Sequence, residues 1–435
     1  MTETFHITEV VGIADIIEER SKRRAEQFHI RQMTVEEIMN DPEIEIVVNL
    51  TYPLSHYIIS KQALESGKHV FAEKMMSTDF ESALELYQLA QSKGLRIGQA
   101  PDTFLGGALQ TARNLIDKGF IGEPVNAQAM VARCYNLTQD ENHPDLPFVF
   151  TAGGSIPYDM GCYYLHALIH LLGPVKTVAG LSKTFHPKEM QRNPRNPGYN
   201  KPFDMKFPTS MTGALDFYNG CYGTFTAISD SHREETARLE IYGTEGTLIL
   251  QDPNYFFGPV YLARGQRGEE MAAMPLTHGY GLHNPVPENA TGEERTWIDS
   301  YRGIGVADMA WAIRNNRPHR CSGELGLHAI EILDGITESC REEKTYRYDY
   351  EPDQPAMRLR DYLWDGGGGL YGYEVKNGCR RGISCGGIFW WGGNRIRPSR
   401  CVGWLCGLWI CSVSGSVLHH APGRQCFLCG TLSLG

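Results

Sequence analysis

Short apolar segments alternate with helical segments over the first hundred residues, and this alternation constrains the fold more than any other feature. Strands are predicted over residues 10–15, 43–50, 68–72 and 95–99, and the main helices over 16–28, 55–66 and 78–94. Thr34 with Glu37, and Thr78 with Glu81, have the spacing that caps a helix N-terminus. Elements that alternate in this way are typical of a parallel sheet covered by helices. We therefore expect an α/β fold with a doubly wound parallel sheet in residues 1–102.

The pattern changes after Pro101, where strand segments become dominant. Strands are predicted over 124–133, 175–185, 209–231 and 237–250, and helices over 108–118, 301–315 and 323–341. The Asn219-Gly220 dipeptide and the turn over 243–246 are hairpin signals, which join antiparallel strands. We expect residues 103–352 to form a second, α+β domain with a mostly antiparallel sheet.

The last segment, residues 353–435, differs in composition from the rest of the chain. Within it, residues 366–435 carry seven of the 12 cysteines and 17 of the 47 glycines, with no helical or strand period. Cys426 and Cys429 form a Cys-x-x-Cys pair near two histidines, but the second ligand pair of a usual zinc site is missing. A disulfide module would need an export signal. We expect a non-native, disordered tail that carries no function.

The charge of the chain excludes two classes of partner. The sequence holds 41 Lys and Arg residues against 51 Asp and Glu residues, a formal net charge of -10 at pH 7. Nucleic acids and anionic membranes require a basic surface, so neither is an expected partner. The first residues do not form a signal-peptide pattern, and no apolar run has the length of a transmembrane helix. We expect a cytoplasmic, soluble protein.

Asp15 lies where an apolar strand ends and a helix begins. In dinucleotide-binding folds an acid at this place, about 20 residues after a glycine-rich loop, binds the ribose hydroxyls. Only 14 residues precede Asp15, so we expect this chain to lack the first strand and the glycine loop of such a fold. The alternative is an ordinary aspartate that caps the following helix.

Two further segments carry groups suited to chemistry. In HVFAEKMMS, Glu73 and Lys74 directly follow a predicted strand, and ligands of open parallel sheets bind beyond the carboxyl ends of strands. In GGSIPYDMGCYYLHALIHLLGP, Asp159 and Tyr163 are four residues apart, which predicts one face of a single helix. Lys74 is therefore expected to point toward the cleft between the two domains.

These segments resemble the Gfo/Idh/MocA oxidoreductase family over residues 8–352. The matching segments include GIADIIEERSKRRAEQF, VVNLTYPLSH, GKHVFAEKMM, RIGQAPDTFLGGALQTARNLIDKGFIGEP, EIYGTEGTLILQDP and GIGVADMAWAIRNNRPHRCSGELGLHAIEIL. The resemblance implies a Rossmann domain, here partial, followed by a domain with an open, mostly antiparallel sheet. It also implies a homo-oligomer that performs NAD(P)-dependent oxidation or reduction of a sugar, a cyclic polyol or a related diol.

The resemblance also assigns residues to roles. The lysine of the family falls on Lys74, its aspartate on Asp159, and its histidine or tyrosine on Tyr163. The cofactor-binding positions that it implies are Asp15, Thr51, Pro53, His56 and Glu73. His166, one helical turn beyond the tyrosine, is the candidate for substrate binding. The sequence departs from the family in two respects, since Met75 replaces the proline of the Glu-Lys-Pro motif and the glycine fingerprint is absent.

We expect Tyr163 to act as the general acid or base, because a nearby ammonium lowers the pKa of a phenol toward neutrality. Lys74 could itself be the base. NAD is expected over NADP, because the Asp15 carboxylate repels a 2′-phosphate, although Arg20, Arg23 and Arg24 leave NADP open. No metal is expected.

Two other functions compete with this one. His166 and His170 have zinc-ligand spacing but lack the glutamate and the third ligand of a zinc hydrolase. The other alternative is a non-catalytic fragment of the same fold that does not bind a dinucleotide.

Overall fold

The computed structural model describes residues 5–134, 153–191, 194, 198–265, 270–277 and 301–347. The chain divides into two compact units, Met1–Val375 and Lys376–Gly435, and all of the described residues lie in the first unit. The expected tail over 353–435 lies outside the described residues. Among the helices that are described, none has both the length and the apolar character needed to cross a membrane.

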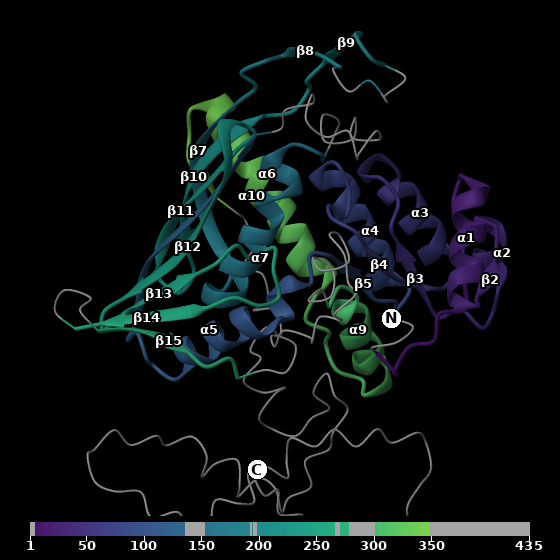
Figure 1. The fold of residues 1–435 in the computed structure, drawn as a ribbon, viewed down its shortest axis with the longest axis horizontal. Helices are drawn as coiled ribbons and strands as arrows, with labels where there is room; N and C mark the ends of the chain where they lie inside the picture. The colour runs from purple at the N-terminus through teal and green to yellow at the C-terminus, as the bar shows by residue number, and fades with distance from the viewer. Residues whose placement is uncertain are drawn as a thin grey trace, which may run out of the picture. The chain divides into compact units, whose positions relative to one another are not determined.

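Parallel strands and helices alternate in the first hundred residues (Figure 1). The elements are β1 (Gly12–Ile13), α1 (Glu18–Phe28), β2 (Arg31–Gln32), α2 (Val35–Asn40), β3 (Ile46–Asn49), α3 (Pro53–Glu65), β4 (His69–Ala72), α4 (Phe80–Ser92) and β5 (Ile97–Gln99). β1 pairs in parallel with β2, and β3, β4 and β5 form a three-stranded parallel sheet in that order. β2 has no counterpart in the sequence analysis, because two residues are too few to show a periodic pattern.

The N-termini of two helices test the expected caps. Thr34 and Glu37 form the reciprocal capping box at the start of α2, as predicted. The cap expected at Thr78 is wrong by one residue, because the Asp79 side chain accepts a hydrogen bond from the Ser82 amide at the start of α4. A carboxylate is a strong acceptor at a helix N-terminus, so Asp79 takes the position that the threonine pattern predicts for its neighbour.

The second half of the described chain is built on a nine-stranded sheet. Its elements are η1 (Thr103–Leu105), α5 (Gly107–Asp117), β6 (Pro124–Cys134), α6 (Ile156–Asp159), α7 (Gly161–Leu172), β7 (Val175–Lys183), β8 (Lys188–Met190), β9 (Pro202–Asp204), β10 (Ser210–Phe217), β11 (Tyr222–Ile228), β12 (Asp230–Gly243), β13 (Thr247–Leu250), β14 (Val260–Arg264), β15 (Glu270–Met274), α9 (Ile304–Arg314), α10 (Gly323–Glu342) and β16 (Tyr346–Arg347). The strand order is β15-β14-β13-β12-β6-β11-β10-β7-β16, and every pair except β6 with β11 is antiparallel. β8 and β9 form a separate antiparallel pair. The expected combination of a parallel sheet with a mostly antiparallel one is confirmed.

Helices cover one face of the nine-stranded sheet and connect it to the parallel sheet. Along β10 and β11 buried residues alternate with less buried ones, so one face of these strands packs against helices and the other does not. α10 contacts β7 of this sheet and also α4 and β5 of the parallel sheet. It lies close to β10 because Gly213 has no side chain, and a Cβ atom there would come within 2.5 Å of Ile336.

Candidate active site

Two charged residues follow β4, where the parallel sheet ends. β4 is the middle strand of its sheet, so it is largely buried, and its carboxyl end leads directly to Glu73 and Lys74. The Glu73 amide donates a hydrogen bond to the Asn49 carbonyl at 2.8 Å, which ties this turn to β3. The peptide bond between Lys74 and Met75 is cis. Lys74 thus leaves the sheet at the edge where parallel sheets bind their ligands.

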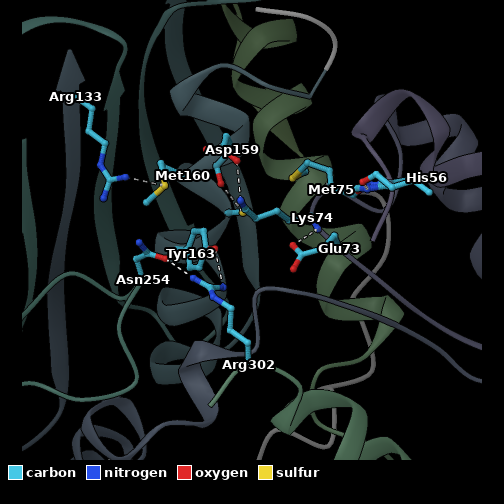
Figure 2. A network of polar contacts seen from close by, with 12 residues as sticks. His56, Glu73, Lys74, Met75, Arg133, Asp159, Met160, Tyr163, Asn254 and Arg302 are labelled. Atoms are coloured by element: carbon cyan, nitrogen blue, oxygen red, sulfur yellow. Dashed lines mark hydrogen bonds and ion pairs between the residues drawn. The ribbon is translucent and has the colours of Figure 1, made fainter. Parts of the chain in front are cut away.

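Lys74 forms an ion pair with Asp159, which comes from the part of the chain that follows the parallel sheet (Figure 2). The distance from Lys74 Nζ to Asp159 Oδ1 is 2.7 Å, and the two side chains are 19% and 14% exposed. The single helix predicted for Asp159 and Tyr163 is wrong, since α6 ends at Asp159 and α7 begins at Gly161. Gly161 lets the chain pass close to Phe225, because a Cβ atom there would lie 2.7 Å from that ring.

Tyr163 completes the group that the sequence analysis brings together. Its side chain is almost fully buried in α7, and Lys74 Nζ lies 5.3 Å from the centroid of its ring. An ammonium, a carboxylate and a phenol therefore meet beyond the carboxyl end of β4, although 89 positions separate Lys74 from Tyr163 (163 minus 74) in the sequence. The predicted convergence of these three side chains is present in the structure.

Two residues at this site do not appear in the sequence analysis. The Arg302 guanidinium donates one hydrogen bond to the Tyr163 hydroxyl at 3.1 Å and another to Asn254 Oδ1 at 3.0 Å (Figure 2). Arg302 precedes α9, and Asn254 lies in the loop between β13 and β14. Arg302 falls within the helix predicted over 301–315, but no pattern there points to a role at this site, so only the packing of distant segments reveals the two residues.

Burial and charge act in opposite directions on the two central groups. Burial lowers the pKa of Lys74, but the carboxylates of Asp159 and Glu73 and the Tyr163 phenol outweigh it, so the pKa lies well above its usual value. Burial raises the pKa of Tyr163, and the charges of Lys74 and Arg302 offset only part of that effect. The expectation that Lys74 lowers the pKa of Tyr163 below its usual value is therefore wrong in its net sign, because desolvation of the phenolate is the larger effect.

The other predicted cofactor positions divide into exposed and buried ones. Thr51 is exposed, and its hydroxyl donates to Asn49 Oδ1 at 2.7 Å. Asp15 is also exposed, and its Oδ1 accepts a hydrogen bond from the Ile17 amide at 2.8 Å, which is a contact expected of an acid near a helix start. Glu73 is partly buried beside Lys74. These three side chains remain accessible to a ligand at the carboxyl edge of the strands.

Pro53 and His56 differ from their expected places on an open wall. Pro53 is buried at the first position of α3, under Gly153. His56 is fully buried, with Nδ1 2.5 Å from the Met75 carbonyl and Nε2 2.7 Å from the Thr51 carbonyl. Because both ring nitrogens face backbone oxygens, the ring connects the two loops that follow β3 and β4.

His166 lies in the core instead of in a substrate pocket. Its side chain is 1% exposed, its ring packs edge-on against Phe104, and Nδ1 lies 3.1 Å from the Pro101 carbonyl. Burial lowers the pKa of His166 to about 4, so the ring is neutral at pH 7. Within the residues that the structure describes, no three His, Cys, Asp or Glu side chains are placed to hold a metal ion.

Two models of known protein families match this chain, one over the region of the parallel sheet and one over the region of the nine-stranded sheet. A family model described as an oxidoreductase family with an NAD-binding Rossmann fold matches residues 1–100, and the GFO/IDH/MocA C-terminal domain matches residues 109–249. The two matches together cover more than half of the chain.

Individual relatives share parts of this sequence. An uncharacterized oxidoreductase of Schizosaccharomyces pombe is 33% identical over 159 residues, which are 36% of this chain, so the chain spans less than half (42%) of that relative. The scyllo-inositol 2-dehydrogenase (NADP(+)) IolW of Bacillus subtilis is 27% identical over 321 residues, 72% of this chain and 81% of the relative.

A solved structure agrees with the fold described above. Levoglucosan dehydrogenase in complex with NADH and levoglucosan superposes with a TM-score of 0.64 at 21% identity, and covers 78% of this chain and 90% of its own. The order of the two sheets, the group that follows β4 and the two matching domain models lead to one conclusion. The chain belongs to the Gfo/Idh/MocA oxidoreductase family.

Proposed function

We propose that the protein is an NAD(P)-dependent oxidoreductase that transfers a hydride between nicotinamide and a secondary alcohol of a sugar or cyclic polyol. The observation that carries the proposal is the contact between Lys74, Asp159 and Tyr163 beyond the carboxyl end of β4. The names of two relatives support the substrate class, since IolW is an inositol dehydrogenase and a solved structure of this fold holds NADH and levoglucosan. Assembly into a homo-oligomer stays a prediction.

The residues around the strand ends fit the nicotinamide end of a dinucleotide. Leu50, Tyr52 and Leu54 are exposed apolar side chains at the carboxyl end of β3, and an apolar surface suits a nicotinamide ring. No side chain caps the N-terminus of α3 next to them, so an amide of its first turn would be available to a ligand. Thr51 and Glu73 would contact the cofactor beside the nicotinamide ring. Asp15 would bind the ribose of the other nucleotide of the cofactor.

The bound nicotinamide would supply or accept the hydride, and the side chains of the chain would handle the proton. Tyr163 would donate its proton to the substrate oxygen in reduction and accept a proton from the alcohol in oxidation. Lys74 would hydrogen-bond the same oxygen and stabilise negative charge on it, while Asp159 holds the ammonium in place. Lys74 is a poor base because Asp159 and Glu73 keep its pKa high, so Tyr163 is favoured for proton transfer.

The direction of the Tyr163 shift predicts a pH dependence. Burial raises the pKa of Tyr163, so at pH 7 the site holds a neutral phenol that is ready to donate a proton. Reduction is therefore expected to proceed at neutral pH, while oxidation, which needs the phenolate, is expected to become faster as the pH rises from 7 to 10.

Substitution of Lys74 tests the proposal. Lys74→Met removes the ammonium and keeps much of the side-chain volume, so turnover should fall by at least about 100-fold. Lys61→Met is the matched control, because Lys61 also pairs with a carboxylate at 2.7 Å but lies on the exposed face of α3. The assay uses sugars and inositols with NAD⁺ and NADP⁺. Unchanged turnover in Lys74→Met would contradict the assigned role.

A second function is a protein of the same fold that does not bind a dinucleotide, since two of the expected cofactor positions, Pro53 and His56, are buried. A fluorescence titration with NADH separates the two functions. Saturable binding in the micromolar range supports the oxidoreductase, and no binding up to millimolar NADH supports the second function.

A further inference from the structure

Arg302 occupies a place at the site that none of the expected roles explains. Its Nη1 donates to the Tyr163 hydroxyl at 3.1 Å, and its guanidinium carbon lies 5.7 Å from the centroid of the same ring. Its Nη2 donates to Asn254 Oδ1 at 3.0 Å. Figure 2 shows these contacts beside the Lys74–Asp159 pair. Two cations therefore lie within 6 Å of one phenol ring, and they come from different segments of the chain.

The two cations differ in how much of their charge is available to Tyr163. Lys74 has a carboxylate oxygen at 2.7 Å, so Asp159 neutralises much of its field. Arg302 has no carboxylate within 4 Å in the part of the chain that the structure describes, and its two hydrogen bonds to Tyr163 and Asn254 go to neutral oxygens. The carboxylates of Asp102 and Glu73 also act on Arg302, but from beyond 4 Å, so its charge is less directly compensated than that of Lys74.

The hydrogen bond from Arg302 also decides where the Tyr163 proton points. A guanidinium has only donors, so the phenol oxygen must accept at this contact. The Tyr163 O–H then needs a different acceptor, and none is present among the described residues. A hydroxyl that accepts from Arg302 can still donate its own proton to the oxygen of a ligand.

Neighbouring segments hold Arg302 in this position from two sides. Asn254 accepts the hydrogen bond from Nη2. Its backbone N–H in turn donates to Asp252 Oδ1 at 2.9 Å, which fixes its position. On the other side, the buried Asp102 accepts hydrogen bonds from the amides of Gly303 and Gly305 at 2.9 and 3.0 Å. The guanidinium is therefore presented to Tyr163 by a preorganised turn.

We propose that Arg302 is a positioning residue that orients the Tyr163 hydroxyl and stabilises the phenolate left when Tyr163 gives up its proton. An N–H donor to a phenol oxygen favours the ionised form over the neutral one. The other titratable groups that face Tyr163 are Lys74, Glu73 and Cys162. Glu73 opposes the phenolate and Cys162 is neutral because burial raises its pKa, so Lys74 and Arg302 are the groups that favour it.

A spectroscopic titration of the full chain tests this without any cofactor or substrate. Tyrosinate absorbance near 295 nm is followed from pH 7 to 12, and subtraction of the Tyr163→Phe curve isolates Tyr163. Tyr222→Phe, which removes an exposed tyrosine, controls the subtraction. In an Arg302→Met background Tyr163 should ionise at a higher pH than in the unmodified chain, and Arg302→Lys should lie between them.

The outcomes separate a positioning role from a structural one. Ionisation of Tyr163 at the same pH in all three chains would overturn the proposal, and so would a Tyr163 that does not ionise before the unmodified chain unfolds. If Arg302→Met does not fold by circular dichroism, Arg302→Gln gives the same comparison, because it keeps an N–H donor and removes the charge. Arg341→Met, on an exposed part of α10, controls for the loss of an arginine.

A kinetic test extends the proposal and rests on the proposed function. Arg302→Met should lower kcat by about 10- to 100-fold, with a smaller change in KM, and should move the alkaline rise of the oxidation rate to higher pH. Arg302→Lys should restore part of the rate. If the unmodified chain oxidises no alcohol, the proposed function fails while the spectroscopic result still decides the role of Arg302. A lower rate with an unmoved pH profile would contradict the positioning role.

Discussion

At the scale of single residues, two lysine–carboxylate pairs with the same geometry differ in their surroundings. Lys74–Asp159 and Lys61–Glu85 both have 2.7 Å between nitrogen and oxygen. The first pair is largely shielded from water, whereas half of the Glu85 side chain is exposed. Removal of one partner from a shielded pair leaves a charge without compensation, while exposed pairs contribute little to stability.

This contrast gives a stability prediction. Asp159→Asn should lower the free energy of unfolding by about 2 kcal/mol, because the Lys74 ammonium loses its nearest counter-charge in a poorly solvated place. Glu85→Gln should leave the melting temperature nearly unchanged. Thermal unfolding followed by circular dichroism measures both. Equal losses in the two variants would show that burial does not distinguish the pairs.

At the scale of secondary-structure elements, the contact between α4 and α10 carries a titratable group. The Asp334 carboxylate of α10 accepts a hydrogen bond from the Phe80 amide at the start of α4, at 3.2 Å. Burial is the largest of the effects that together raise the pKa of Asp334 to about 7; the nearby Glu81 and Asp79 carboxylates also raise it, whereas hydrogen bonds from the Phe80 amide and the Tyr158 side chain lower it. Because α10 also packs on β7, this carboxyl group lies where the helices of the two sheets meet.

The raised pKa of Asp334 predicts how stability depends on pH. The folded chain binds this proton more tightly than the unfolded chain, so this group makes the free energy of unfolding fall as the pH rises from about 4 to about 7. Asp334→Asn removes the titration, so the fall in the free energy of unfolding that this group causes between pH 5 and pH 8, about 2.7 kcal/mol, should be absent in this variant. Melting temperatures at the two pH values measure it, with the exposed Asp204→Asn as control. An identical pH dependence in Asp334→Asn and the unmodified chain would refute this prediction.

At the scale of the whole molecule, the buried side chains that the structure describes all belong to the first compact unit. They run from Phe5 to Ser339 and join the parallel sheet to the nine-stranded sheet through α10. The sequence of residues 366–435 is rich in glycine and cysteine and shows no periodic pattern of apolar residues.

Deletion of the second unit tests this division. A chain that ends at Val375 should melt within a few degrees of the full chain, because every buried contact of the described core is retained. Differential scanning calorimetry compares the melting temperatures of the two proteins. Their turnover on a sugar or inositol that the full chain oxidises provides a second measurement. A large loss of melting temperature would mean that residues 376–435 support the folded core.

Much of the fold follows from short-range patterns in the sequence. Strand–helix alternation predicts the parallel sheet, hairpin signals predict the pairing of β10 with β11, and the Thr34–Glu37 spacing predicts the cap of α2. The place of Glu73 and Lys74 at a strand end is also readable, because the carboxyl end of a parallel strand is defined by the strand itself. These features depend on neighbours within a few residues, and local chemistry is sufficient to determine them.

The tertiary structure decided the rest of the site. The sequence does not reveal that Arg302 reaches Tyr163, that His56 and His166 are buried, or that the helix breaks between Asp159 and Gly161. The net direction of the Tyr163 pKa also depends on how much water the fold removes from the phenol. Desolvation and contacts between distant segments arise only when the chain packs, so no local pattern contains them.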